Sequence, residues 1–183
     1  RDVIRSLRHP EPRIVVGAAI VLGRLADRRV VPNLVEAFQR DDETIGAAVA
    51  WALGGCGDAA SVPWLLSAVE QGFVVANACE ALGRIGDPRA LNVLIKVIRT
   101  SQGATRAHAA RAVGLICRPS HVRSGIGLRS GEAIRMKAVS ALKMILKDPQ
   151  RKVRLSASIA LYGLGETASA GDLCAGDPHG SDD

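Results

Sequence analysis

The chain has 183 residues, of which 48% are hydrophobic and only 3% are aromatic, and it carries a formal net charge of +6. Ala, Leu, Val and Ile can fill a sizeable core, which suits stacked helices better than an aromatic-rich sheet. No apolar run approaches the roughly 18 residues of a membrane span, and no leader with a small-residue cleavage site opens the chain, so we expect a soluble, cytoplasmic protein.

The first eight residues predict the second helix of an incomplete repeat. Val3, Ile4 and Leu7 have the same apolar spacing as the helix predicted at 89–99. Pro10 then prevents that helix from continuing. We therefore expect the chain to start in mid-repeat, as a piece of something longer.

The following residues predict alternating first and second helices, because their apolar positions recur at helical spacing. We expect first helices at 13–25, 44–53, 74–85, 105–116 and 152–164, and second helices at 28–39, 60–69, 89–99 and 138–149.

A ten-residue motif, EALGRIGDPR at 80–89, marks the turn between two paired helices. We expect Gly83 to let the last helical turn press against a neighbour, and Gly86 to take the left-handed conformation that ends a helix. Asp87 is predicted to cap the next helix and Pro88 to open it.

Similar motifs recur along the chain. The shared glycines are Gly23, Gly54, Gly83 and Gly114, separated by 31, 29 and 31 residues. Such a period indicates an all-α solenoid, because a unit of this size cannot bury its apolar face alone and must stack on the next.

The fourth unit departs from the pattern, since Cys117 and Arg118 stand where Gly and Asp stood before. About 18 residues, 118–135, are inserted there, and their Pro, Ser, Gly and Arg predict an exposed loop ending at a capped helix start near 130–132. Two interpretations stay open. Its arginines, Arg123 and Arg129 among them, form an anion site with the glycines, or they lie dispersed on a solvated loop.

The positive charge is concentrated in one part of the chain. Residues 101–165 contain 12 Lys and Arg against 2 Asp and Glu, whereas residues 166–183 contain 5 Asp and Glu and no Lys or Arg. We interpret 166–183 as an acidic, irregular tail. The basic run from Lys143 to Arg154 suits nucleic acid or an acidic protein, but it lacks the aromatic residues that stack on bases.

Units of about 30 residues with a first helix ending in ALGxxGD and a D-P turn between units resemble HEAT-like repeats, specifically the short type named after phycobilisome lyases. The resemblance covers 1–165 and implies a right-handed α-solenoid of four to five helix pairs, with first helices on the convex side and second helices on the concave side. It would place on the concave surface Arg29, Asn33, Trp64, Arg89, Asn92, Lys96 and Lys137.

The resemblance does not extend to the metal chemistry of one enzymatic branch. Deoxyhypusine hydroxylases of this fold hold iron with His-Glu pairs, and none of the four histidines here is followed by Glu. The four cysteines stand far apart and predict small buried thiols in a reducing compartment: Cys56, Cys79, Cys117 and Cys174. We therefore expect no catalytic residue, no cofactor and no metal.

The two tryptophans differ in their predicted roles. Trp64 stands on the exposed stripe of a second helix, where it either anchors a partner or covers the groove between adjacent second helices. Trp51 is predicted to pack over a neighbouring helix.

These patterns favour a non-enzymatic protein-protein interaction scaffold that binds a partner through its concave surface and through the inserted loop with Arg123 and Arg129. The basic charge of the chain would suit an acidic partner protein. Two alternatives remain open: binding of nucleic acid or another polyanion through 101–165, and a bilin lyase-type subunit.

Overall fold

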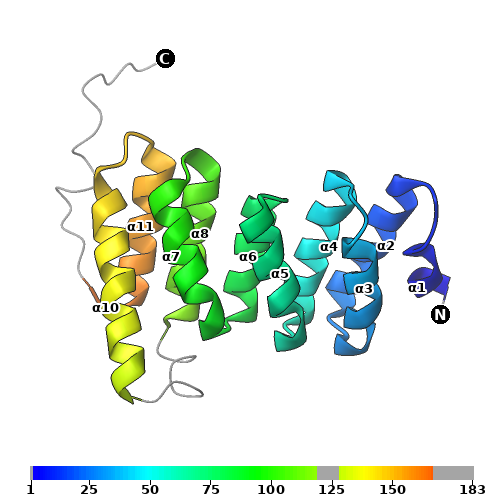
Figure 1. Cartoon of the computed structure of the whole chain (residues 1–183), viewed down its shortest axis with the longest axis horizontal. Helices are drawn as coiled ribbons and strands as arrows, with labels where there is room; N and C mark the ends of the chain where they lie inside the picture. Colours follow the sequence, from blue (N-terminus) through cyan, green and yellow to red (C-terminus); the bar gives the residue numbers. More distant parts are fainter. Residues whose placement is uncertain (1, 119–127, 167–183) are drawn as a thin grey trace.

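The computed structural model of the chain is an array of helices laid side by side (Figure 1). It describes residues 2–118 and 128–166, apart from the side chains of 128–131. These ranges contain helices and no strand, which confirms the all-α prediction. Several predicted features lie outside the described residues: Arg123, the side chain of Arg129, Cys174 and the acidic tail from residue 167 onward.

First and second helices alternate along the chain. The first helices are α2 (Pro12–Leu25), α4 (Glu43–Cys56), α6 (Val75–Ile85), α8 (Gly103–Ile116) and α11 (Arg151–Gly163). The second helices are α1 (Asp2–Ser6), α3 (Val31–Phe38), α5 (Val62–Gln71), α7 (Leu91–Thr100) and α10 (Leu128–Met144). Short 3-10 turns precede α3, α5 and α7 and follow α10: η1 (Arg28–Val30), η2 (Ala59–Ser61), η3 (Pro88–Ala90) and η4 (Ile145–Lys147).

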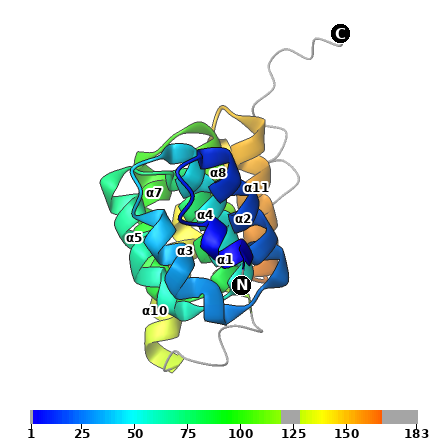
Figure 2. The same cartoon turned by 90° about the vertical axis from the view of Figure 1, so that its right-hand side faces the viewer.

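The first helices form one continuous layer, in which α2 packs on α4, α4 on α6, α6 on α8 and α8 on α11. The second helices α3, α5 and α7 each pack on the first helix of the following unit. Viewed from the end of the array, α3, α5 and α7 lie on one side, and α2 and α11 lie toward the other (Figure 2).

Glycine permits the close approach of successive first helices. A Cβ atom placed on Gly23, Gly54, Gly83 or Gly114 would lie 2.6, 2.8, 2.7 or 2.7 Å from the Cα atom of an alanine on the next first helix. Those alanines are Ala52, Ala81, Ala112 and Ala160. The predicted role of the repeated glycine in stacking is therefore confirmed. The glycines recur about every 30 residues because each interface between successive first helices has one Gly-Ala contact.

The repeated aspartates cap the turn between paired helices, as predicted. The side chains of Asp27, Asp58 and Asp87 each accept a hydrogen bond from the backbone N–H two residues later at 2.9 Å. Their own carbonyls accept from the N–H three residues later, which closes a 3-10 turn. This tight turn consequently precedes α3, α5 and α7, and each of these helices starts two or three residues later than the apolar spacing alone predicts.

Left-handed residues end the first helices α2, α4 and α6. Gly57 and Gly86 have φ values of 61° and 77°, which agrees with the prediction for Gly86. Ala26 holds the same place after α2 with φ at 52°. An alanine there is strained, because its Cβ crowds the following carbonyl.

The insertion differs from the predicted loop in its second half. Helix α10 begins at Leu128, before the predicted start near 130–132, so 128–135 extend the second helix. Two contacts hold the later part of this extension against the array. Ile134 packs against the core, and Arg135 donates a 2.9 Å hydrogen bond to the carbonyl of Leu164 at the end of α11.

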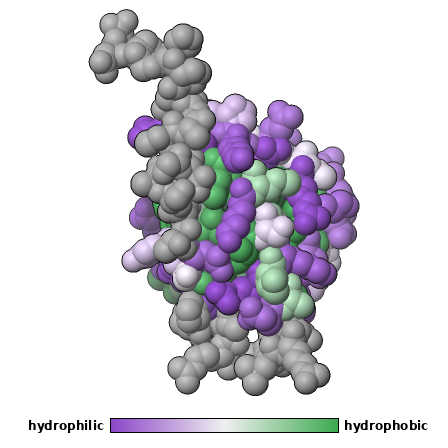
Figure 3. All heavy atoms as spheres, turned by 90° about the vertical axis from the view of Figure 1, so that its left-hand side faces the viewer, coloured by the Kyte–Doolittle hydropathy of each residue, from purple (hydrophilic) through white to green (hydrophobic). Residues whose placement is uncertain are grey.

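The α10–α11 end of the array shows hydrophobic surface between hydrophilic side chains (Figure 3). Exposed apolar residues of α11 include Leu155, Ile159 and Tyr162, and Tyr162 is 83% exposed. Tyr162 occupies the position of the stacking glycine in the other first helices. Among the described residues no further first helix follows α11, so this position is free of the close contact that requires glycine elsewhere.

Candidate functional site

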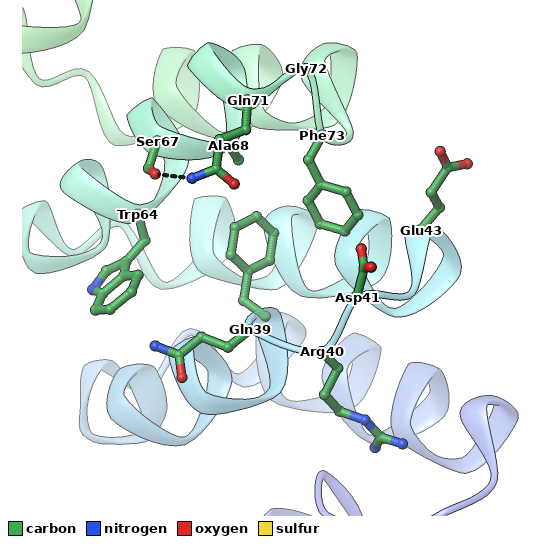
Figure 4. A pocket seen from close by; sticks show the side chains of 11 residues that line it. Gln39, Arg40, Asp41, Glu43, Trp64, Ser67, Ala68, Gln71, Gly72 and Phe73 are labelled. Atoms are coloured by element: carbon green, nitrogen blue, oxygen red, sulfur yellow. Dashed lines mark hydrogen bonds between the residues drawn. The ribbon is translucent and has the colours of Figure 1, made fainter.

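A groove of about 620 Å³ lies between the second helices α3 and α5. Phe38, at the end of α3, and Phe73, just after α5, form its floor, with ring centroids 5.8 Å apart and planes inclined at 66°. The edge-to-face arrangement is a favourable one for aromatic rings. Figure 4 shows the ring of Phe73 at the centre of the groove.

Local sequence places Phe73 in this floor. Gly72 ends α5 in the left-handed conformation with φ at 78°, and the N–H of Phe73 donates to the carbonyl of Ala68 at 2.9 Å. The turn directs the ring against α4, where Gly46 leaves room for it. A Cβ atom on Gly46 would lie 2.5 Å from the ring of Phe73.

The two ends of the groove differ in chemistry. Trp64 of α5 lies at one end and is 41% exposed. The carboxylates of Asp41 and Glu43 lie toward the other end (Figure 4). Arg40 also lines the groove, but its guanidinium points away from both carboxylates and donates to the carbonyl of His9 at 2.9 Å.

A second, smaller groove of about 300 Å³ lies on the other side of α3, between α3 and α1. Asn33 lines it, and Arg40 borders both grooves. An ion pair 2.8 Å long joins Arg8, in the turn after α1, to Glu36 of α3. The structure thus places Asn33 and Trp64, both predicted partner-binding residues, in grooves on either side of α3.

Two other predicted binding residues are engaged with their own helix caps. Arg29 and Arg89 each form a forked pair with the aspartate two residues earlier, with closest distances of 2.8 Å to Asp27 and 2.6 Å to Asp87. The hydrogen bonds from these guanidiniums hold the pKa of both carboxyls below the usual value. Arg89 also donates to the carbonyl of Ala59 in the preceding unit at 3.1 Å.

The remaining predicted residues lie further along the array. Asn92 and Lys96 are exposed on α7, and Lys137 is exposed on α10. Arg129 belongs to α10, but its side chain is outside the described part of the chain, and so is Arg123. These residues stay predictions for a contact surface that continues beyond the two grooves.

Sequence reasoning missed Phe38, Phe73, Asp41 and Glu43 as groove residues. A signal was present, because the chain has only two phenylalanines and both lie near the ends of second helices. Their meeting depends on how far α3 and α5 stand apart, which periodicity does not specify.

The predicted basic run is only partly a surface feature. Arg154 is 2% exposed, and its Nη1 donates to the carbonyls of Asp148 and Pro149 at 3.1 and 3.0 Å. The buried carboxylate of Asp148 is also paired with Arg106 from the start of α8. Arg154 is therefore a structural residue, contrary to its inclusion in a surface run, because its helical position faces the packed connection between η4 and α11.

Three cysteines and one tryptophan have the structural roles that were predicted. Cys56, Cys79 and Cys117 are buried, and burial raises the pKa of Cys79 to about 12 and that of Cys117 to about 11. Trp51 packs under Arg84 of α6, whose guanidinium carbon lies 5.2 Å from the ring centroid. In the described part of the chain no group of His, Cys, Asp or Glu could hold a metal ion, and none of its helices is long and apolar enough to cross a membrane.

Comparison with known families and structures supports the repeat assignment. A family model for HEAT repeats matches residues 2–75 and 74–161. No curated protein sequence matches the chain significantly.

Three solved structures share the fold at low identity. An engineered protein has a TM-score of 0.63 at 18% identity, covering 89% of this chain and 78% of its own. The complex of CpcE and CpcF of phycocyanin lyase from a Nostoc species has 0.59 at 19% identity, covering 93% and 77%. A computationally designed armadillo repeat protein for modular peptide recognition has 0.55 at 16% identity, covering 88% and 80%.

Proposed function

The chain belongs to the HEAT repeat family, and from that premise we propose that it is a non-enzymatic scaffold that binds a partner protein through the exposed side of its second helices. The observation that carries the proposal is the α3–α5 groove, where Trp64 is 41% exposed beside an aromatic floor. Exposed aromatic side chains in grooves are frequent anchors at protein interfaces, because they offer large contact area and lose little conformational entropy.

The rigidity of the array supports this function. Backbone-close contacts between first helices hold successive units in fixed relation, so side chains on separate second helices are presented in one arrangement before binding. The designed armadillo repeat protein with the same fold is described as a peptide binder, which is consistent with this use of stacked helices.

A quantitative pull-down from native lysate tests the proposal with wild type and Trp64→Ala. Leu25→Ala is the matched control, because Leu25 is 67% exposed but lies at the end of first helix α2, outside both grooves. We expect Trp64→Ala to deplete at least one specific partner that Leu25→Ala retains. If all three proteins capture identical sets of partners, this groove is not part of the binding site.

Polyanion binding is the second candidate, and it rests on Lys147, Arg151 and Lys152, which are exposed around the connection between α10 and α11. The set is smaller than the sequence predicts, because Arg154 is buried and Lys143 pairs with Glu166 at 3.0 Å. Binding to mixed-sequence DNA or RNA should be strongest at low salt, since counterion release drives it. No binding under those conditions would exclude this candidate.

The bilin lyase-type alternative is supported only by the likeness of fold to the CpcE and CpcF subunits. The direct test is transfer of a bilin to a phycobiliprotein subunit. Transfer would replace the scaffold proposal with an enzymatic one, whereas absence of bilin binding and transfer would exclude the alternative.

A further inference from the structure

We infer that the α3–α5 groove binds an extended segment of a partner protein in which a large apolar side chain lies close to Lys or Arg. The inference rests on the proposed scaffold function and specifies the chemistry of the segment. The inference is based on two features that lie at different places in this groove: an aromatic floor and a pair of exposed carboxylates.

The apolar part of the segment matches the aromatic floor. Phe38, Phe73 and Ala68 line the groove with Trp64 at one end. A Leu, Met or aromatic side chain placed there would remove apolar surface from water on both molecules, which is the main favourable term in such contacts. The groove volume of about 620 Å³ falls within the range of ligand-binding clefts in proteins.

The basic part of the segment matches the acidic end. Asp41, Glu43 and Arg40 are the charged residues that line the groove, and Arg40 is directed toward the carbonyl of His9. The neighbouring Asp42 is engaged in capping α4, because its side chain accepts from the N–H groups of Thr44 and Ile45. The carboxylates of Asp41 and Glu43 are thus the charges presented to a ligand, and they favour a cation.

Amide side chains in the groove suit an extended backbone. Gln71 of α5 donates from its Nε2 to the hydroxyl of Ser67 at 2.8 Å, which orients its amide within the groove. Gln39, after α3, is exposed on the opposite wall. Amide groups on two walls can bond to the N–H and C=O groups of a peptide that lies between them.

The partner chemistry expected at this groove differs from that expected elsewhere on the same side. Lys96 and Lys137, on α7 and α10, favour the acidic partner that the overall charge predicts. Asp41 and Glu43 favour a basic segment at the other half of the array. A single partner would therefore need opposite charges at its two points of contact.

The test is a selection of random linear dodecapeptides displayed on phage against the full chain, followed by fluorescence polarisation with the consensus peptide. We expect the enriched peptides to combine Leu, Met, Phe or Trp with a nearby Lys or Arg. Asp41→Asn combined with Glu43→Gln should weaken the consensus peptide by about tenfold, and Trp64→Ala should weaken it by a similar factor.

Glu70→Gln is the matched control, because Glu70 is an exposed carboxylate of α5 that does not line the groove. It should leave the affinity unchanged. Raising the salt concentration from about 50 to about 500 mM should weaken the wild-type complex, because salt screens the attraction between the peptide and the two carboxylates. The effect of salt should be smaller in the double variant, which lacks these two charges.

Several outcomes would overturn the inference: enrichment of acidic peptides, no enrichment, or equal affinity of the consensus peptide for wild type and the double variant. The failure of the scaffold proposal is distinguishable from these. If Trp64→Ala depletes a partner from lysate while the double variant does not, only the basic-segment inference fails. If Trp64→Ala affects neither the partner set nor the peptide, the groove is not the binding site.

Discussion

Gly83 and Ala112 touch so closely that a methyl group does not fit between them. A Cβ atom on Gly83 would lie 2.7 Å from the Cα and 2.8 Å from the Cβ of Ala112. The same relationship recurs at each of the first-helix interfaces, so the backbone separation of the array is set by these pairs.

Gly83→Ala should destabilise the array by about 1 to 3 kcal/mol, because the added methyl group would force α6 and α8 apart. The matched control is Gly17→Ala on α2, where a Cβ atom would meet nothing within 4 Å. That change should stabilise the chain by about 0.5 to 1 kcal/mol through higher helix propensity. Urea unfolding followed by circular dichroism measures both, and equal effects of the two changes would contradict the role of the contact.

Ala26→Gly should raise stability by about 1 kcal/mol, because Ala26 holds φ at 52° in a position where glycine is unstrained. The reciprocal change is Gly57→Ala, at φ 61° and with nothing within 4 Å of its Cβ atom, so it adds strain without a clash. It should lower stability by a similar amount. Thermal unfolding of the three proteins gives the comparison, and a lower midpoint for Ala26→Gly would refute the strain argument.

Asp87→Asn should reduce the stability of the chain at neutral pH more than at acidic pH. The hydrogen bonds from Arg89 lower the pKa of the folded Asp87 carboxyl. A carboxyl whose pKa is lower in the folded state stabilises that state above the unfolded pKa, and this contribution is lost as pH falls through the lowered value. Asparagine can still cap the turn, so only the charge is removed.

The pH effect is measured as the difference in unfolding free energy between wild type and Asp87→Asn at about pH 7 and about pH 3. We expect a small difference that shrinks at the lower pH, since the Arg89 side chain is 58% exposed and solvent screens the pair. In an Arg89→Met background, the effect of Asp87→Asn should depend less on pH, because the largest cause of the lowered pKa is removed and the backbone hydrogen bond from residue 89 remains. A difference that grows on acidification would mean that the pair does not lower the pKa.

Arg154→Gln should destabilise the end of the array by about 2 to 3 kcal/mol, because it removes the charged hydrogen bonds that the buried Arg154 donates to the carbonyls of Asp148 and Pro149. Arg151→Gln, three residues earlier on the exposed side of α11, is the control and should change stability by less than about 0.5 kcal/mol. Hydrogen exchange should show the lost protection in α11. If both variants lose protection equally, Arg154 is not a structural residue.

Local and periodic features of this protein were predictable from its amino acids alone. The stacking glycines, the capping aspartates at 27, 58 and 87 and the left-handed end at Gly86 follow from short-range chemistry repeated at one interval. The helix bounds agree to within a few residues for the same reason. Where repetition failed, after Cys117, the prediction also weakened, and the start of α10 was placed too late.

Tertiary structure decided the features that depend on two units at once. The first helices α2, α4 and α6 touch, whereas α3 and α5 stand apart and leave a groove in which Phe38 and Phe73 meet. The repeat period of the sequence does not specify this difference between the two sides of the array. Arg154 looks like surface charge in the sequence, yet its side chain is buried by the connection from η4. The sequence alone thus determined the unit and its repetition, whereas the packing of successive units determined the groove and which charges face the solvent.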